Sequence, residues 1–266
     1  MKPTLPSATV LLCVFNGAKT LDRCLYSLQQ QTTQDFCIVC IDDASTDEST
    51  DFLRQWQEKF GTERFFLYEN KVNLGLTRSL NFGLSHIKTT FTARIDADDW
   101  WHPEKLEKQL AYLKINPPCG VVGTWYENHG HRGIRKIPLP ETDTAIKASI
   151  LRQNPFAHSA VVFQTELIRA HGGYNNQWKY GQDYELWLRL LSYTKFANIP
   201  EYLCYRSADD TLTAKKQREQ MFSCVKTQLL YLKQYHRPLW EYCFILNPLL
   251  VALAPEWLRQ LKRRFL

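Results

Sequence analysis

The chain has 266 residues, of which 44% are hydrophobic and 23% are charged, a composition that is typical of a folded protein and excludes wholesale disorder. Its net charge of +6 is uneven, because residues 212–266 hold most of the excess of lysine and arginine. An enzyme of nucleic acids would carry its positive charge near the catalytic core, so we expect no nucleic-acid partner.

Short apolar runs alternate with helical patterns through the first 115 residues. The runs typical of buried strands are 9–15, 36–42, 64–69 and 91–95, and each precedes hydrophobic residues at helical spacing. Four such strand–helix units predict an α/β fold with a mostly parallel central sheet flanked by helices. Ligands of such sheets bind at the carboxyl ends of the strands.

The pattern loosens after residue 116. We expect further strands at 120–127 and 158–163, and an amphipathic helix over 183–193. From about residue 211 a long helix is predicted to run to Tyr235, and the chain then ends in a basic segment. The C-terminal part is therefore expected to form a helical tail behind the α/β domain.

Three aspartates, Asp96, Asp98 and Asp99, stand within four positions where the fourth strand ends. Pro103 is favoured at the first position of a helix, which makes His102 the expected N-cap and leaves the aspartates unused for capping. On an extended strand exit, Asp96 and Asp98 would point to one side and Asp99 to the other. Two carboxylates on one side suit a divalent cation that holds phosphates, and a solvated turn is the alternative.

Other chemically informative residues fall near the same predicted rim. Asp43 follows the second strand, where its carboxylate could accept a hydrogen bond from a nucleobase or shape a turn before a helix. Arg78 opens a later helix and could meet a phosphate or ribose, or be a solvated surface charge. Asp183 precedes an apolar helix, so it could be a catalytic base or a helix cap.

Most of the eight cysteines stand in apolar runs, which indicates a reducing compartment. The pair in CIVC at 37–40 lies in a predicted strand, where residues three apart face opposite sides, so we expect neither a zinc nor a redox site. No segment approaches the roughly 20 apolar residues of a membrane span, and none has the features of a signal peptide. We therefore expect a cytoplasmic protein.

The ordered series of motifs resembles the inverting family 2 glycosyltransferases, which have the nucleotide-sugar-binding fold called GT-A. The resemblance covers about residues 8–206 and runs through VLLCVFNGAKTLDRCLYSLQQQT, CIDDASTDES, NLGLTRSLNFGL, ARIDADDWWHPEKLEKQ, NPFAHSAVVFQTELIRAHGGY, GQDYELWLRL and YR. It implies a catalytic domain over 1–210, with a nucleotide-binding half over about 1–115 and an acceptor half over 116–210. Residues 211–266 would be the tail.

The resemblance also implies a role for each residue that matches the family's motifs. The residues that would contact the nucleotide are Phe15, Asn16, Asp43, Arg78, Asp96 and Asp98. Asp96 and Asp98 would also form the Asp-x-Asp motif that binds Mn²⁺ or Mg²⁺, and Asp183 would be the general base. The acceptor side would hold His158, Trp178 and Arg206, and Arg206 matches a basic position near the diphosphate. Gln182 departs from the family, which often has an acidic residue there, so contacts with the acceptor are expected to differ.

The end of the tail is both apolar and basic. In EWLRQLKRRFL, an apolar stripe of Trp257, Leu258, Leu261 and Phe265 lies beside four cationic residues. That composition is typical of a helix that lies on anionic lipid, so residues 243–266 could bind the inner face of the membrane. A helix docked on the catalytic domain is the alternative.

Residues and resemblance together predict a metal-dependent, inverting glycosyltransferase. It would move one sugar from a UDP- or dTDP-linked donor to a hydroxyl of a cell-surface glycan or a lipid-linked acceptor, since the Gln-x-x-Arg-Trp motif of processive synthases is absent. Two alternatives stay open, a non-catalytic nucleotide-sugar-binding protein of the same fold and a Mg²⁺-dependent phosphohydrolase. The intact Asp98 and Asp183 argue against the first of them.

Overall fold

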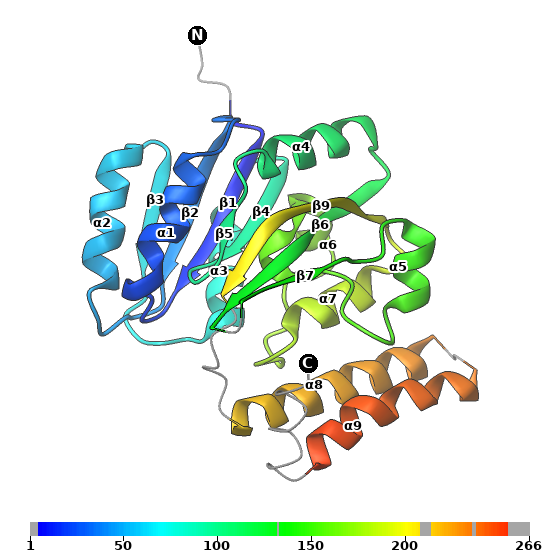
Figure 1. The fold of residues 1–266 in the computed structure, drawn as a ribbon. Coiled ribbons are helices and arrows are strands. Elements are labelled where there is room, and N and C mark those ends of the chain that lie inside the picture. The colour runs from blue at the N-terminus through cyan, green and yellow to red at the C-terminus, as the bar shows by residue number, and fades with distance from the viewer. Residues whose placement is uncertain (1–4, 132, 208–213, 236–237, 255–266) are drawn as a thin grey trace.

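The computed structural model describes residues 5–131, 133–207, 214–235 and 238–254, and in this part of the chain a nine-stranded sheet forms the centre (Figure 1). Its strands are β1 (Ala8–Val14), β2 (Phe36–Asp42), β3 (Phe65–Glu69), β4 (Phe91–Asp96), β5 (Trp100–Trp101), β6 (Cys119–Gly130), β7 (Gly133–Ile137), β8 (Val162–Gln164) and β9 (Lys195–Ser207).

Helices cover both faces of this sheet (Figure 1). The α-helices are α1 (Ala18–Gln29), α2 (Ser49–Phe60), α3 (Leu76–His86), α4 (Lys105–Ile115), α5 (Asp143–Ser149), α6 (Thr165–Ala170), α7 (Gln182–Leu190), α8 (Ala214–Gln234) and α9 (Leu246–Leu253). Two short 3₁₀ helices, η1 (His158–Ala160) and η2 (Leu239–Ile245), complete the described elements.

The first four long strands are parallel and lie in the order β3-β2-β1-β4. Their register pairs Val14 with Asp42, and Cys13 with Asp96, so the carboxyl ends of three strands meet at one edge. Beyond β4 the sheet continues through the antiparallel β8 to β6 and β9, which are parallel to each other. The predicted α/β fold with helices on both faces of a central sheet is confirmed.

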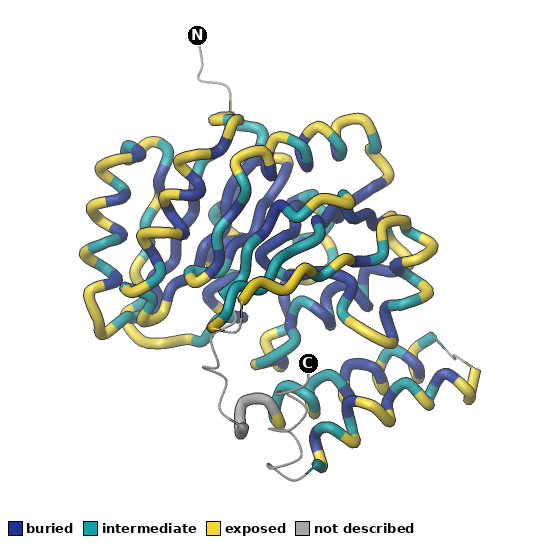
Figure 2. The backbone as a smooth tube through the Cα atoms, viewed as in Figure 1, coloured by how far each residue is buried: buried dark blue, intermediate teal, exposed yellow. Residues whose placement is uncertain are grey.

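The core has two layers, one on each face of the sheet. The strands β1, β2 and β4 are dark along most of their length in Figure 2 because both layers bury them. Val10 and Leu12 of β1 belong to the cluster that also holds residues of α1, α2 and α4. Leu11 and Cys13, which point the other way, belong to the cluster with α3, α6 and α7. Burial on both faces explains why this strand is apolar at every position rather than at alternate ones.

The C-terminal helices α8 and α9 lie side by side next to α7 (Figure 1). Side chains of α8 join this pair of helices to the preceding part of the chain. Ser223 Oγ donates to the carbonyl oxygen of Tyr180 over 2.5 Å, and Gln228 Nε2 donates to the carbonyl oxygen of Leu151 over 2.7 Å. In the described residues, α8 is thus docked on the α/β part of the chain, and α9 packs on α8.

The amphipathic end of the tail lies outside the described residues. Its predicted stripe of Trp257, Leu258, Leu261 and Phe265 falls there, so contact between this stripe and a membrane stays a prediction. Within the described part of the chain, no helix has the length and hydropathy needed to cross a membrane.

The predicted strand over 158–163 is wrong at its start. His158–Ala160 form the helical turn η1, closed by a hydrogen bond from Ala160 N to the carbonyl oxygen of Ala157 (2.9 Å), and the strand begins only at Val162. The turn directs Ser159 Oγ toward Asp96, to which it donates over 3.0 Å. A tertiary contact therefore prevails over the apolar β-propensity of this run.

The predicted start of the helix after the aspartates is also wrong, by two residues. The helix α4 begins at Lys105, and its N-cap is Glu104 rather than His102. His102 still organises this turn, because its Nδ1 lies 3.3 Å from Glu104 N and its carbonyl oxygen accepts from Lys105 N over 3.1 Å. The expectation that the aspartates take no part in capping this helix holds.

Candidate active site

A cavity of about 1320 Å³ lies at the carboxyl ends of β1, β2 and β4 and extends to α8 and α9. This volume exceeds the roughly 300–1000 Å³ of most sites for one small ligand. Of the ten residues that the sequence predicts for the site, those lining the cavity are Phe15, Asp43, Asp96, His158, Asp183 and Arg206. Those that do not line it are Asn16, Arg78, Asp98 and Trp178.

Asp96 ends β4 at the floor of the cavity, and both of its carboxylate oxygens are engaged. The guanidinium of Arg94, which is completely buried, pairs with Oδ1, and Ser159 Oγ donates to Oδ2 over 3.0 Å. Burial by itself would raise the pKa of Asp96, but Arg94, with His158, lowers it to about 2. Asp96 is therefore a fixed, ionised acceptor.

Asp98 and Asp99 have opposite surroundings, but the predicted extended strand exit is wrong, because β4 ends at Asp96 and a turn follows, closed by Asp99 N donating to the carbonyl oxygen of Asp96 over 3.2 Å. The Asp98 side chain is exposed and makes no ion pair or hydrogen bond with another described residue. Asp99 is 3% exposed, accepts a hydrogen bond from Ser207 N (3.1 Å) and lies 3.7 Å from Nε of Arg206. Burial and then the charge of Asp96 raise the pKa of Asp99 to about 7. Asp99 thus anchors the end of β9, and the carboxylate of Asp98 is exposed, so its predicted role as a ligand of a cation stays a prediction.

The chemistry of this edge fits a cation that a diphosphate helps to hold. Among the described residues, no group of three or more His, Cys, Asp or Glu is placed to bind a metal by itself. Mg²⁺ and Mn²⁺ suit oxygen ligands, and Mg²⁺ commonly takes one or two carboxylates while phosphates and water complete its shell. Asp98, with Asp96 two residues away, offers that kind of partial site.

Asp43 folds the segment that borders the cavity in front of α3. It is 3% exposed, and its Oδ1 accepts from Asn70 Nδ2 (2.7 Å) and from Leu74 N (2.9 Å), while Oδ2 accepts from Gly75 N (2.8 Å). Gly75 has a φ of 84°, a conformation that favours glycine, and it is the N-cap of α3. The carboxylate therefore shapes residues 70–75, and its predicted role in binding a base stays a prediction.

We expect Asp43→Ala to lower the free energy of unfolding by about 2–3 kcal/mol, because the backbone N–H groups of Leu74 and Gly75 lose a charged acceptor. Urea denaturation measures this. The matched control is Asp51→Ala on α2, whose side chain is 74% exposed and lies 3.9 Å from Arg54, so its change should stay below about 1 kcal/mol. Equal changes in the two variants would contradict the structural role of Asp43.

Three predicted nucleotide contacts lie at the rim or outside the cavity. Phe15 is half exposed and lines the cavity. Asn16 has a φ of 53°, and its Oδ1 accepts from Thr46 N over 2.8 Å, so it fixes the loop after β1. Arg78 is exposed on α3 and makes no ion pair with another described residue. Phe15 therefore borders the cavity that Asp183 also lines, whereas Asn16 and Arg78 do not line it.

Asp183 lies across the cavity, in the first turn of α7. Gly181, with a φ of 67°, is the N-cap of this helix, so the alternative that Asp183 caps it is wrong. Asn154 Nδ2 donates to Oδ2 of Asp183 over 2.7 Å. Burial raises the pKa of Asp183, and the hydrogen bonds from Asn154 and from the backbone act against that rise. A carboxylate of this kind is suited to accept a proton.

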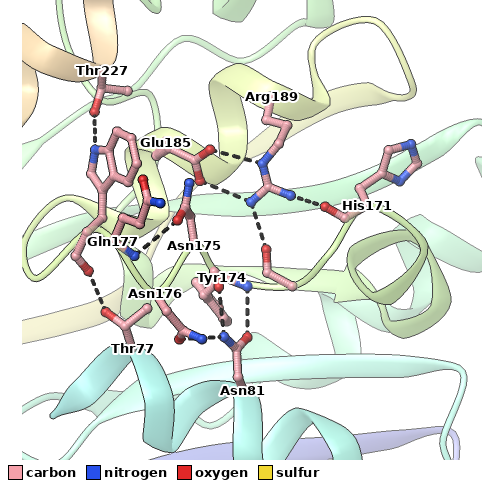
Figure 3. A network of polar contacts seen from close by, with 12 residues as sticks. Thr77, Asn81, His171, Tyr174, Asn175, Asn176, Gln177, Glu185, Arg189 and Thr227 are labelled. Atoms are coloured by element: carbon pink, nitrogen blue, oxygen red, sulfur yellow. Dashed lines mark hydrogen bonds and ion pairs between the residues drawn. The ribbon is translucent and has the colours of Figure 1, made fainter. Parts of the chain in front are cut away.

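The loop that leads to Asp183 is held by a polar network, which Figure 3 shows. Asn81 of α3 bonds to both backbone groups of Tyr174, donating to its carbonyl oxygen over 2.7 Å and accepting from its N–H over 2.8 Å. Arg189 of α7 donates to the carbonyl oxygen of Gly173 over 2.7 Å and pairs with Glu185 over 3.0 Å. The network fixes the loop relative to α3 and α7, and so fixes the position of the base candidate.

Two of the three predicted acceptor-side residues, His158 and Trp178, differ in their surroundings. His158 lines the cavity, its Nε2 lies 2.9 Å from the hydroxyl of Tyr174, and burial and then Arg94 lower its pKa well below the ordinary range. Trp178 is 3% exposed, and its Nε1 donates to Thr227 Oγ1 of α8 over 2.6 Å (Figure 3). Trp178 therefore packs α8 against the catalytic part, and its predicted contact with an acceptor stays a prediction.

Sequence reasoning missed two residues that the site depends on. Arg94 stands in the stretch ARID, inside an apolar strand. A charged residue at such a position indicates a buried ion pair, and Arg94 does pair with Asp96. Asn154 stands in NPFAHS, and nothing in its spacing predicts a contact with Asp183, which lies 29 residues further along the chain.

Comparisons with known proteins agree with this geometry. The family model described as Glycosyl transferase family 2 matches residues 9–172. The chain is 31% identical over 259 residues to the putative glycosyltransferase EpsE of Bacillus subtilis, covering 94% of this chain and 90% of that protein. It is 30% identical over 199 residues to the UDP-Gal:alpha-D-GlcNAc-diphosphoundecaprenol beta-1,3-galactosyltransferase of Escherichia coli, covering 72% and 70%.

The fold is similar to that of a solved structure, the mannosyltransferase PcManGT from Pyrobaculum calidifontis in complex with GDP-Man and Mn²⁺. The TM-score is 0.70, the sequence identity is 19%, and the match covers 96% of this chain and 72% of that one. At this identity the likeness concerns the fold.

Proposed function

The chain belongs to glycosyl transferase family 2, and from this premise we propose that it moves one sugar, with inversion, from a UDP- or dTDP-linked donor to a hydroxyl of a cell-surface glycan or a lipid-linked acceptor. Members of the family are enzymes that act on nucleotide sugars. The observation that carries the proposal is that Asp43, Asp96 and Asp183 line one cavity, although Asp43 and Asp183 are 140 residues apart in the chain.

The donor would lie on the side of β1, β2 and β4. Asp96 would accept hydrogen bonds from ribose hydroxyls, since Arg94 and Ser159 hold its carboxylate in one orientation. Arg206, also lining the cavity, would face the diphosphate. A cation bound to Asp98 and the diphosphate would stabilise the negative charge that develops on the leaving nucleotide. The Escherichia coli relative with UDP-Gal in its name supports a uridine nucleotide as donor.

The acceptor would lie on the side of α7. Asp183 would take the proton from the attacking hydroxyl as the bond to the sugar forms, and Asn154 would keep the carboxylate aimed at that hydroxyl. Attack from the side opposite the leaving group inverts the anomeric centre.

Residues 243–266 would bring this cytoplasmic enzyme to anionic lipid. Loss of sedimentation with anionic vesicles when residues 255–266 are removed would test this membrane contact.

The two alternatives from the sequence are set aside. Relatives over most of the chain are named as glycosyltransferases, which is not what a phosphohydrolase would show. A non-catalytic binding protein would have no need of a carboxylate held as Asp183 is held, in the cavity and by a side-chain hydrogen bond.

The test is a thermal-shift screen of the full chain with UDP, dTDP and GDP, each with and without Mn²⁺. We expect one nucleotide to raise the melting temperature, and Mn²⁺ to increase the rise. In Asp98→Asn the nucleotide should still stabilise, while the increment from Mn²⁺ should be lost, because one ligand of the cation is neutral. The control Asp51→Asn should keep the increment. Absence of stabilisation by every nucleotide would overturn the proposed function.

A further inference from the structure

The helices α8 and α9 form one wall of the cavity. None of the residues to which we assign a role in sugar transfer lies on this wall. The side chains on this wall are mostly apolar, namely Met221, Cys224, Pro248, Leu250, Val251 and Ala254. The helix α8 of this wall packs against α7, which carries Asp183. We therefore expect the wall to border the substrate that Asp183 would deprotonate.

The apolar surface continues from this wall to the outside of α9. The sequence of α9, LNPLLVAL, contains no charged residue. Leu246, Leu250 and Leu253 have helical spacing, so they share one face, and they are 55%, 66% and 58% exposed. Leu250 belongs both to this face and to the cavity wall. Among the described residues, nothing covers this row, and contiguous exposed apolar surface of this kind marks a binding site.

A cation lines the cavity close to the residue that holds the base. Arg152, Gln153 and Asn154 are consecutive residues that line the cavity, and Asn154 bonds to Asp183. Arg152 is exposed, has its guanidinium 5.1 Å from the ring centre of Phe244 in η2, and makes no ion pair with another described residue. The backbone of Arg152 therefore lies within about 7 Å of the backbone of Asn154, on the side of the cavity that holds Asp183.

The order of these features points to one class of acceptor. We propose, on the basis of the proposed function, that the acceptor is a sugar joined through a phosphate or diphosphate to an apolar chain. The reacting hydroxyl lies at Asp183, Arg152 binds the phosphate, and the apolar chain runs along α9 against Leu250 and Val251. An arginine without an ion pair suits a phosphate, which it can bind through two N–H groups.

A free glycan fits this wall poorly. Sugar hydroxyls that leave water need hydrogen-bond partners, and the wall offers three polar side chains, Gln220, Gln228 and Asn247, of which Gln228 already donates to the carbonyl oxygen of Leu151. An apolar chain gains free energy on the same surface, because it covers the exposed leucines of α9.

The probe for this site is farnesyl diphosphate, which has the diphosphate and the apolar chain but no sugar. Binding to the full chain is measured by calorimetry below the concentration at which the probe forms micelles, with UDP and Mn²⁺ present in saturating amounts to fill the donor side. We expect binding to the wild type. Farnesol and inorganic diphosphate, each with half of the recognition elements, should bind at least about tenfold more weakly.

Two variants and two matched controls make the result specific. Leu250→Asn and Arg152→Gln should each weaken binding of farnesyl diphosphate by about tenfold. Leu239→Asn is the control for the first, since Leu239 is 86% exposed but does not line the cavity. Arg218→Gln is the control for the second, since Arg218 also lies over an aromatic ring, 5.7 Å from that of Phe222, outside the cavity. Both controls should bind as the wild type does.

Unchanged affinity in Leu250→Asn or in Arg152→Gln would overturn the inference. So would a shift of the oligomeric state in Leu250→Asn without loss of probe binding, which would make the α9 face an interface between two copies of the chain. The proposed function fails separately, because UDP binding is measured first in the same samples. If UDP binds and farnesyl diphosphate does not, the enzyme class stands and only the lipid-linked acceptor is lost.

Discussion

Replacing Asp183 with asparagine is expected to lower the turnover of sugar transfer by about 10²–10⁴-fold, the usual contribution of a general base. Asparagine has nearly the same shape and keeps an oxygen for the hydrogen bond from Asn154, but it cannot take the proton of the acceptor hydroxyl. Affinity for the donor should stay within about twofold of the wild type, because Asp183 lies across the cavity from Asp43 and Asp96. Transfer is measured as release of the nucleoside diphosphate in the presence of acceptor.

The pH dependence of transfer gives a second readout of the same residue. Burial raises the pKa of Asp183 above the ordinary 3.8, and only the ionised form can accept a proton. Turnover should therefore fall as the pH drops through this raised pKa. Asn154→Ala removes a hydrogen bond that favours the ionised form, so the acidic limb should move to higher pH.

The control for both measurements is Asp51→Asn on α2, an exposed carboxylate that does not line the cavity, which should leave turnover and its pH dependence unchanged. Turnover within tenfold of the wild type in Asp183→Asn would remove this residue as the base. An acidic limb that moves to lower pH in Asn154→Ala would show that their hydrogen bond does not favour the ionised form.

Replacing Arg94 with methionine is expected to lower the free energy of unfolding by about 3 kcal/mol. Arg94 is completely buried and pairs with Asp96, and removal of one partner leaves a carboxylate without its countercharge at the cavity floor. The side chain of Asp96 is 32% exposed, which places the expected cost at the lower end for buried pairs. Donor affinity should fall as well, since Asp96 loses the group that fixes its orientation. Urea denaturation and titration with UDP measure the two effects.

An exposed ion pair provides the comparison. Arg54→Met breaks a contact of 3.0 Å with Glu69, but the two side chains are 58% and 43% exposed, so the loss should stay below about 1 kcal/mol. Arg94→Lys should keep part of the stability and recover less of the donor affinity, because an ammonium lacks the planar geometry of the guanidinium. A stability of Arg94→Met equal to that of the wild type would show that the pair does not hold the cavity floor.

The behaviour of Asp96 shows where sequence patterns stop. Strand alternation predicts that Asp96 and Asp98 point to one side and Asp99 to the other, but the chain turns after Asp96, so the turn and not the period of two separates the exposed Asp98 from the buried Asp99. Arg94 and Ser159 also occupy both oxygens of Asp96. Ser159 lies 63 residues further along the chain, and no local pattern indicates that contact.

The sequence by itself determines the strand–helix units of the first half, the resemblance to the family and the residues that can carry charge chemistry, while the strand order comes from the structure. Local periodicity sets strands and helices, and the ordered motifs are specific because each is tied to one strand end. Only the tertiary structure decides that α8 and α9 complete the cavity, that Asn154 holds Asp183, and that Arg94 holds Asp96. Those contacts join residues by packing and burial. Their contribution to the free energy depends on which polar and charged groups the fold buries next to one another.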